Sequence, residues 1–170
     1  MVLRKAKTAD IPVIWEILQH GIQQRKEDGS EQWQNGYPNE QTVWDDIDKD
    51  CACVLVDEDR VIAYAALIKG TEPAYHIIDG EWLNNDDYIT VHRVAASKDA
   101  KGKGVGKELF HRIEALCINE KIYNIRVDNR FDNATMLKIL ERLKYTFCGD
   151  IMMNGAERRA YQKELRKDRS

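Results

Sequence analysis

The sequence has few residues of the kinds that mark disulfide-stabilised, fibrous or disordered proteins. Of its 170 residues only four are Cys, three are Pro and ten are Gly. These counts exclude a disulfide scaffold, a collagen repeat and a low-complexity chain. The chain holds 26 Lys and Arg against 29 Asp and Glu, a net charge of −3, so no excess of positive charge points to nucleic acid as a partner. With 43% hydrophobic residues, a chain of this length can bury its own core.

Long apolar runs are also missing. None approaches the roughly 20 residues that a membrane-spanning helix needs, and residues 1–10 lack the layout of a signal peptide. We therefore expect a cytoplasmic protein with no membrane partner, folded as one domain over residues 1–170 with a frayed, charged tail at 163–170. Cys51 and Cys53 have the spacing of one strand face, which is not a common zinc pattern, so we predict buried thiols and no metal.

Hydrophobic periodicity predicts a mixed α+β fold. The expected order is a strand, two helices, an antiparallel meander, and then strand, helix, strand, helix and two strands. Helices are expected to begin after Asp10, Asn39, Lys103 and either Asp132 or Asn133. The expected strands are residues 2–5, 51–56, 60–68, 88–96, 122–127, 145–153 and 158–162. Residues 69–87 are expected to form a long polar loop.

The most informative segment is a basic glycine loop between the strand at 88–96 and the next helix. Its sequence is Lys101-Gly102-Lys103-Gly104-Val105-Gly106-Lys107. Glycines let backbone N–H groups approach a ligand closely, and a helix N-terminus adds partial positive charge. The pattern therefore favours a phosphate-binding site. The alternative is a flexible turn with solvated lysines.

The spacing of the loop narrows the choice of phosphate ligand. A P-loop needs a glycine at position 101 and a hydroxyl residue at position 108, where Lys101 and Glu108 stand. A dinucleotide fingerprint needs a further glycine at position 107 or 109, where Lys107 and Leu109 stand. Asp128 has the place of a ribose-binding acid, so a nucleotide-dependent oxidoreductase stays open. However, the loop follows a meander and does not open a repeated βαβ unit.

Residues 92–96, followed by the glycine loop, resemble the acetyl-CoA motif of the GNAT superfamily of N-acetyltransferases. That motif runs from an apolar strand into Arg/Gln-x-x-Gly-x-Gly/Ala at a helix start, and Lys101 replaces the usual Arg or Gln. Residues 126–128, Asn133 and residues 143–145 resemble the second signature, with Lys-Tyr in place of Gly-Phe. The element order agrees along essentially all of the chain. The loops Gly36-Tyr37-Pro38 and Gly80-Glu81-Trp82 further resemble those of uncharacterised bacterial members.

The resemblance implies a fold, a reaction and a cofactor site. The fold is a mostly antiparallel, twisted sheet of six to seven strands flanked by about four helices, and dimers are common. The reaction is transfer of an acetyl group from acetyl-CoA to a primary amine, of a small molecule or a peptide, by direct attack in a ternary complex. The implied cofactor contacts are Val94, Ala95, Ala96, Lys101, Gly102, Lys103, Gly104, Val105, Gly106, Lys107 and Asn133.

The tyrosine that usually donates the proton to the departing thiolate in this superfamily is missing from the sequence. Many members of the superfamily use a tyrosine on the helix after the Asn as the acid, and the matching position holds Leu140, next to Ile139. Tyr123 and Tyr145 are the nearest tyrosines, but core packing is more typical of their strand positions. The missing acid supports an alternative hypothesis, a CoA-binding sensor module without catalysis.

Glu81 and His92 are the candidate catalytic residues, with Asp79 as a further candidate base. Glu81 precedes Trp82 in the long loop, where a solvated surface acid is the alternative. His92 lies on the cofactor strand, and alternation places it on the same side as Val94. A structural, hydrogen-bonded histidine is the alternative there.

Four residues are candidates for contact with the acceptor amine. Trp33, Tyr37 and Trp82 lie in two loops, where aromatic rings can bind a cation or pin the loops to the core, and we favour pinning. Asp128 can orient an amine or cap a turn. The acidic loops favour a cationic amine only weakly.

Overall fold

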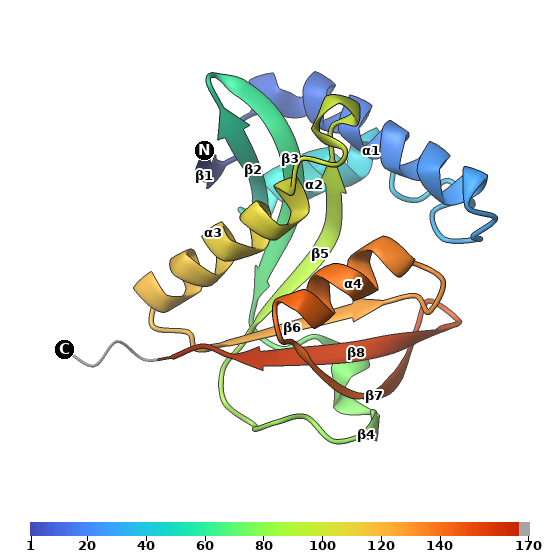
Figure 1. Ribbon diagram of the computed structural model, residues 1–170, viewed down its shortest axis with the longest axis vertical. Coiled ribbons are helices and arrows are strands. Elements are labelled where there is room, and N and C mark those ends of the chain that lie inside the picture. Colours follow the sequence, from blue (N-terminus) through green and yellow to red (C-terminus); the bar gives the residue numbers. More distant parts are fainter. Residues whose placement is uncertain (167–170) are drawn as a thin grey trace. The chain divides into compact units, whose positions relative to one another are not determined.

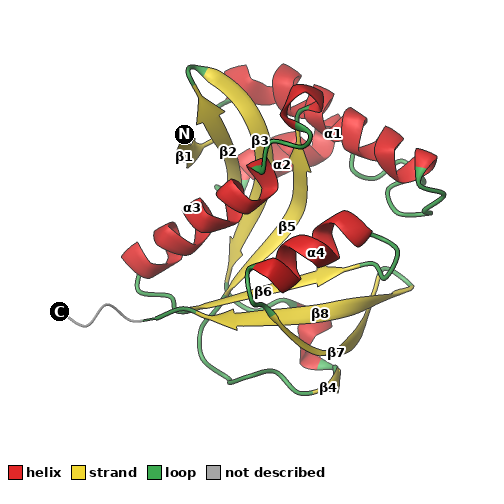
Figure 2. Ribbon diagram, viewed as in Figure 1, coloured by secondary structure: helices red, strands yellow, loops and turns green. Residues whose placement is uncertain are grey.

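The computed structural model describes residues 1–166 (Figures 1 and 2). Its helices are α1 (Ile11–Glu27), α2 (Glu40–Asp48), α3 (Val105–Asn119) and α4 (Ala134–Arg142). Its strands are β1 (Val2–Lys5), β2 (Ala52–Asp57), β3 (Arg60–Lys69), β4 (Asp79–Gly80), β5 (Ile89–Ala96), β6 (Asn124–Asn129), β7 (Thr146–Met153) and β8 (Ala156–Glu164). Short 3-10 turns are formed by Thr8–Asp10, Pro73–His76 and Lys98–Ala100.

The strands form one mixed sheet in the order β1-β2-β3-β5-β6-β8-β7-β4. The ladders β1–β2, β2–β3, β6–β8, β7–β8 and β4–β7 are antiparallel, whereas β5–β6 is parallel. The predicted α+β fold with a mostly antiparallel sheet is confirmed. Residues 1–166 contain eight strands where six to seven were predicted. The additional strand is β4, which has two residues and lies within the segment 69–87 that was expected to be a loop.

The chain divides into two compact units. The first comprises Met1–Leu67 and Arg93–Arg112, and the second comprises the described residues of Ile68–His92 and Ile113–Ser170. Strand β5 passes from the second unit to the first between His92 and Arg93. The expectation of one domain over the whole chain stays a prediction.

The first unit has its own apolar core, because α1 and α2 bury one stripe each. Ile14 and Leu18 of α1 are fully buried with Val43 of α2, and they pack with β2, β3 and Ala95 of β5. Helix α2 begins where predicted: the side chain of Asn39 accepts a hydrogen bond from the backbone N–H of Thr42.

The second unit contains an aromatic cluster to which the segment 69–87 contributes Tyr75 and Trp82. Tyr75 and Tyr88 pack with Ile151 and Ala160. The guanidinium carbon of Arg126 lies 4.1 Å from the ring centre of Tyr88 and also 4.1 Å from that of Trp82. This stack holds the segment against the strands, which the sequence pattern of a polar loop did not indicate.

Several strand boundaries differ from the prediction, and two of these differences concern the C-terminal tail and Asp128. Strand β8 continues to Glu164, and the backbone N–H of Leu165 donates to the carbonyl of Tyr123 over 2.7 Å. The tail predicted to fray from residue 163 is therefore ordered to that point, while its last part, 167–170, lies outside the described residues. Strand β6 ends at Asn129, two residues later than expected, so Asp128 lies inside the strand and not after it.

The four cysteines are buried thiols, as predicted. In residues 1–166, no helix has the length and apolar character that a membrane crossing requires.

Candidate functional site

The glycine loop lies in the first unit and precedes α3. The N–H of Glu108 donates the first helical bond, to the carbonyl of Gly104 over 3.1 Å, so the N–H groups of Val105, Gly106 and Lys107 have no acceptor within the helix. Gly104 has a φ of +69°, and no heavy atom lies within 4 Å of the position that a Cβ would take there. Backbone donors, open space and a helix N-terminus together fit a phosphate ligand.

The exposed flank of this loop is basic. Lys101, Lys103 and Lys107 are exposed, and Gly102 has a φ of +78° with open space around it, like Gly104. Three cations beside uncommitted N–H groups give the loop the charge that a pyrophosphate needs. The residues predicted to hold the phosphates therefore form one exposed turn, in which N–H groups and lysine side chains are available to an anion.

Strand β5 leads into this loop with an irregular backbone. Its parallel ladder with β6 covers only Ile89 and Thr90, although β6 itself continues. Three residues later Arg93 has a φ of +55°, a left-handed conformation that is rare for a residue with a Cβ. Because this conformation breaks the alternation of a strand, the prediction that His92 and Val94 share one side cannot be drawn from residue spacing.

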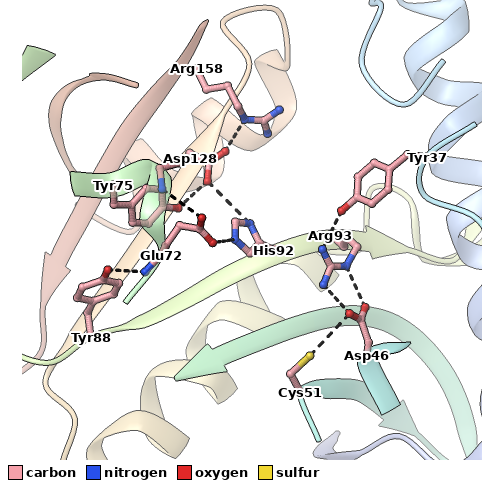
Figure 3. Close-up of polar contacts among 11 residues, drawn as sticks. Tyr37, Asp46, Cys51, Glu72, Tyr75, Tyr88, His92, Arg93, Asp128 and Arg158 are labelled. Carbon is pink, nitrogen blue, oxygen red and sulfur yellow. Dashed lines mark hydrogen bonds and ion pairs between the residues drawn. The ribbon is translucent and has the colours of Figure 1, made fainter. Parts of the chain in front are cut away.

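A buried polar group surrounds Arg93, and we call Arg93, Asp46 and Tyr37 the Arg93 cluster (Figure 3). Nε and Nη2 of Arg93 donate to the two carboxylate oxygens of Asp46 over 2.9 and 2.6 Å, and Nη1 donates to the hydroxyl of Tyr37 over 2.8 Å. Tyr64 of β3 also donates its hydroxyl to Asp46, and Sγ of Cys51 lies 3.7 Å from it. All of these residues belong to the first unit.

These contacts fix the charge states of the cluster. Burial lowers the pKa of Arg93. The hydrogen bonds to Asp46 and Tyr37 and the charges of these two partners raise it by a larger amount, so the net shift of the pKa is upward. Burial and the charge of Asp46 raise the pKa of the Tyr64 hydroxyl. The same two causes raise the pKa of Cys51 to about 11. At neutral pH, Arg93 is therefore a cation, and Tyr64 and Cys51 keep their protons.

A second polar group lies in the second unit, and we call His92, Asp128, Glu72, Tyr75 and Arg158 the His92 cluster (Figure 3). Nδ1 of His92 lies 3.8 Å from Asp128, and its Nε2 lies 3.5 Å from Glu72. Asp128 also accepts from the hydroxyl of Tyr75 over 2.5 Å and from Nε of Arg158. The result is an imidazole between two carboxylates.

Burial differs within the His92 cluster and suggests separate roles. The side chain of Asp128 is 1% exposed, while those of His92 and Glu72 are 14% and 21% exposed. Burial, followed by the charge of Asp128, raises the pKa of Tyr75 well above its usual value, so Tyr75 remains a hydrogen-bond donor. Asp128 is therefore a buried anchor, and the groups that solvent or substrate can reach are His92, Glu72 and Arg158, whose side chain is 18% exposed.

Glu81, the other candidate catalytic residue, and the positions considered for the usual tyrosine acid have different surroundings. Glu81 is exposed and follows β4, where its backbone N–H donates to the carbonyl of Cys148 over 3.0 Å. Leu140 is fully buried. Tyr145 is buried, and its hydroxyl donates to Glu114 over 3.3 Å. Burial raises the pKa of Tyr145 well above its usual value, which agrees with the predicted packing role.

Asn133 caps α4, as one of its predicted roles requires. Its side-chain oxygen accepts from the N–H of Met136 over 3.3 Å, and its Nδ2 donates to the side chain of Asn129, also over 3.3 Å. A cofactor contact by Asn133 stays a prediction.

The aromatic candidates are pinned to the protein. The six-membered ring of Trp33 contacts α1 at Gly21, where an added Cβ would lie 3.0 Å from it. Nε1 of Trp82 donates to the carbonyl of Tyr75 over 2.9 Å. Tyr37 is 40% exposed although its hydroxyl accepts from Arg93. These contacts support the favoured role of pinning, and contact of these three rings with substrate stays a prediction.

Sequence reasoning assigned no site role to Asp46, Glu72, Tyr75 or Arg158. One signal was available for Asp46: it lies three residues after Val43 in α2, on the face that the helix buries. A carboxylate on a buried face needs a cationic partner. The partner itself could not be named from residue spacing.

Comparisons with known proteins agree with this geometry. Residues 16–145 match the model of the Acetyltransferase (GNAT) family. No curated protein matches the chain.

Three solved structures illustrate the structural likeness. An acetyltransferase of the GNAT family from Streptococcus agalactiae is 33% identical, with a TM-score of 0.91 over 98% of this chain and 96% of that chain. One from Listeria monocytogenes is 24% identical, with a TM-score of 0.75 over 96% and 94% of the two chains. A ribosomal-protein-alanine N-acetyltransferase from Brucella melitensis is 16% identical, with a TM-score of 0.64 over 97% and 100%. The last two show a shared fold alone.

Proposed function

We propose that this chain, which belongs to the GNAT acetyltransferase family, transfers the acetyl group of acetyl-CoA to a primary amine. The observation that carries the proposal is the glycine loop at the start of α3. Uncommitted N–H groups, open space and exposed lysines lie together in this loop, which follows strand β5 after one short 3-10 turn. A pyrophosphate is the ligand that such a loop suits.

The cofactor site that we propose is built from two segments of the first unit, the end of strand β5 and the glycine loop, which are joined by residues 97–100. The N–H groups of residues 102 and 104–107 would hold the pyrophosphate, with the side chains of Lys101, Lys103 and Lys107 beside it. The backbone N–H of Lys103 donates to the carbonyl of Ala100 over 3.2 Å. The backbone groups of Val94 and Ala96 would hold the pantetheine arm as an added strand holds its neighbour, with Ala95 between them. For Asn133, which belongs to the second unit, a cofactor contact stays a prediction. When bound, acetyl-CoA supplies a thioester, whose carbonyl carbon accepts the amine.

His92 is the residue that we propose to move the proton. It lies in β5, the strand of the residues proposed to hold the pantetheine arm, and its imidazole is held between Asp128 and Glu72. A held imidazole can take one proton from the ammonium group of the acceptor before attack. The neutral amine then forms the N–C bond as the C–S bond breaks, and the proton that the nitrogen loses next passes through water to the departing thiolate. Asp128 orients the ring, and a backbone N–H of β5 polarises the carbonyl oxygen. Glu81 is an alternative base that would act through water.

Ligand binding tests the cofactor first. Acetyl-CoA at about 100 times its dissociation constant adds roughly 2.7 kcal/mol to the folded state. For a chain of this size, that should raise the melting temperature by about 5–10 °C. NADH and ATP serve as controls, and a shift with NADH alone would favour the oxidoreductase reading instead.

Release of CoA thiol in the presence of amines then tests catalysis. We expect His92→Gln to lower kcat by about 10²-fold or more, while Glu81→Gln, a matched change at an exposed acid, leaves kcat within about twofold. The second candidate function is a CoA-binding sensor, favoured by the buried Leu140 at the position of the usual acid. Binding without thiol release from any amine tested would favour the sensor.

The acceptor amine, a homodimeric state, the absence of nucleic-acid and membrane partners, and the cytoplasmic location stay predictions. Trp33, Tyr37 and Trp82 are the proposed aromatic contacts of the acceptor. Asp128 is too buried to contact it unless the cluster opens.

A further inference from the structure

Arg93 combines two features that are seldom found together in a strand. Its backbone has a φ of +55°, and its guanidinium group forms a bidentate ion pair with a buried carboxylate. A left-handed backbone is unfavourable for any residue with a Cβ, and such strain persists only where the surroundings impose it. Glycine would adopt this backbone readily, yet the chain has an arginine here.

The carboxylate that holds Arg93 is itself fixed from several directions. Asp46 is on α2, its side chain is 5% exposed, and it accepts the hydroxyl of Tyr64 on β3 as well as both guanidinium bonds. The planar fork of arginine matches both oxygens of this carboxylate at once, which a lysine cannot do. Tyr37 adds a third contact to the same guanidinium group. The side chain of Arg93 is therefore anchored in position and in direction.

Anchoring at Arg93 has a consequence for the residues that follow it. A left-handed residue turns the next peptide groups of a strand away from their regular alternation. The next three residues, 94–96, are those assigned to the pantetheine arm, and Ala95 is packed into the core of the same unit. The direction of their N–H and C=O groups depends on the backbone of Arg93.

The geometry points to Arg93 and Asp46 as positioning residues for the cofactor-binding strand. Their ion pair holds Arg93 in its left-handed conformation and so directs the backbone groups of residues 94–96. This inference rests on the proposed function, because it concerns the same cofactor segment. It adds two residues that contact neither the thioester nor the amine.

A pair of double variants separates the backbone effect from the loss of the side chain. Asp46→Asn/Arg93→Ala and Asp46→Asn/Arg93→Gly both remove the guanidinium group, and neither leaves a buried carboxylate charge behind. They differ in that Gly adopts a left-handed backbone readily and Ala does not. We expect the Ala variant to bind acetyl-CoA about tenfold more weakly than the Gly variant by titration calorimetry.

A second ligand tells positioning from general structural damage. Adenosine 3′-phosphate 5′-diphosphate, the nucleotide half of CoA, lacks the pantetheine arm and would contact only the glycine loop. Its affinity should stay within about twofold in both variants. Equal acetyl-CoA affinities in the Ala and Gly variants, or equal losses for both ligands, would overturn the inference.

Two further measurements keep the test decisive. If the Ala variant does not fold, Asp46→Asn alone should weaken acetyl-CoA several-fold and leave the nucleotide half unaffected, and no change would count against the ion pair. If the wild-type chain does not bind acetyl-CoA, the proposed function fails. Amide hydrogen exchange then decides the inference separately: faster exchange of residues 94–96 in Ala than in Gly supports it, and equal rates contradict it.

Discussion

Nδ1 of His92 lies 3.8 Å from an oxygen of Asp128, a carboxylate that already accepts hydrogen bonds from Tyr75 and Arg158. A carboxylate with these partners and a side chain that is 1% exposed cannot follow a moving substrate. It can hold a neighbouring imidazole in one orientation. Asp128 therefore belongs to the support of the proposed base.

Asp128→Asn should lower kcat about 10-fold to 100-fold and leave the KM for acetyl-CoA nearly unchanged. The amide cannot offer His92 a charged acceptor, whereas the residues that contact Asp128, namely Tyr75, Arg158 and His92, are not among the proposed cofactor contacts. Initial rates of thiol release at varied acetyl-CoA measure both constants. A large rise in that KM with an unchanged kcat would contradict an orienting role.

The glycine loop gives a prediction about charge and shape. Gly104→Glu should weaken acetyl-CoA binding at least tenfold, because a carboxylate would enter the open space that now faces uncommitted N–H groups. Gly104→Asn is the matched control, since Asn tolerates the left-handed backbone and carries no charge. Calorimetric titration of both variants is the measurement. If the two variants lose the same affinity, charge is not the reason.

Trp82 should matter for stability more than for substrate. Trp82→Ala removes a ring that stacks on Arg126 and a hydrogen bond to Tyr75, and we expect a loss of roughly 2 kcal/mol in the free energy of unfolding. Leu83→Ala, at the next residue and 41% exposed, should cost less than half of that. Urea denaturation gives both values. A rise in amine KM without loss of stability would instead favour substrate contact.

Gly80 and Gly149 face each other across the β4–β7 ladder. A Cβ on Gly149 would lie 2.2 Å from the carbonyl oxygen of Asp79. Gly149→Ala should therefore destabilise the fold by about 3 kcal/mol, more than Gly155→Ala, which has a positive φ but open space. Thermal melts compare the two. Similar losses would mean that the backbone angle, and not the close approach, sets the cost.

Because two thiols are buried, we expect the free energy of unfolding to fall at high pH. Burial first, and then the charge of a neighbouring carboxylate, raises the pKa of Cys51 to about 11 and that of Cys117 to about 12, from an ordinary value of 9.0. Above pH 9 the unfolded chain releases these protons while the folded chain keeps them. The free energy of unfolding must therefore fall as pH rises from 9 to 11.

The matched variant for this pH dependence is Cys51→Ala/Cys117→Ala. Chemical denaturation at pH 8, 9, 10 and 11 should show a shallower decline for the variant than for the wild-type chain. Identical slopes would mean that the thiolates are not excluded from the folded state.

Much of the molecule follows from local sequence. Helices α2 and α4 begin where Asn39 and Asn133 supply caps. The hairpin of β7 and β8 turns at Asn154-Gly155, as expected from the turn chemistry of that pair. The glycine loop and the two motifs also indicate the family from residue order and spacing, without any tertiary contact. These features depend on residues close together in the chain, where propensity and spacing decide the outcome.

The polar clusters could not be predicted in that way. Arg93 meets Asp46 across 47 residues of sequence, and Tyr75 meets Asp128 across 53. Spacing showed that His92 lies on the cofactor strand, but not that carboxylates flank its ring. The sequence by itself determined most of the elements, their order and the position of the glycine loop, because these rest on local propensity and periodicity. Only the tertiary structure decided which buried charges meet, since the partner of a buried charge is chosen by the packing of elements far apart in the chain.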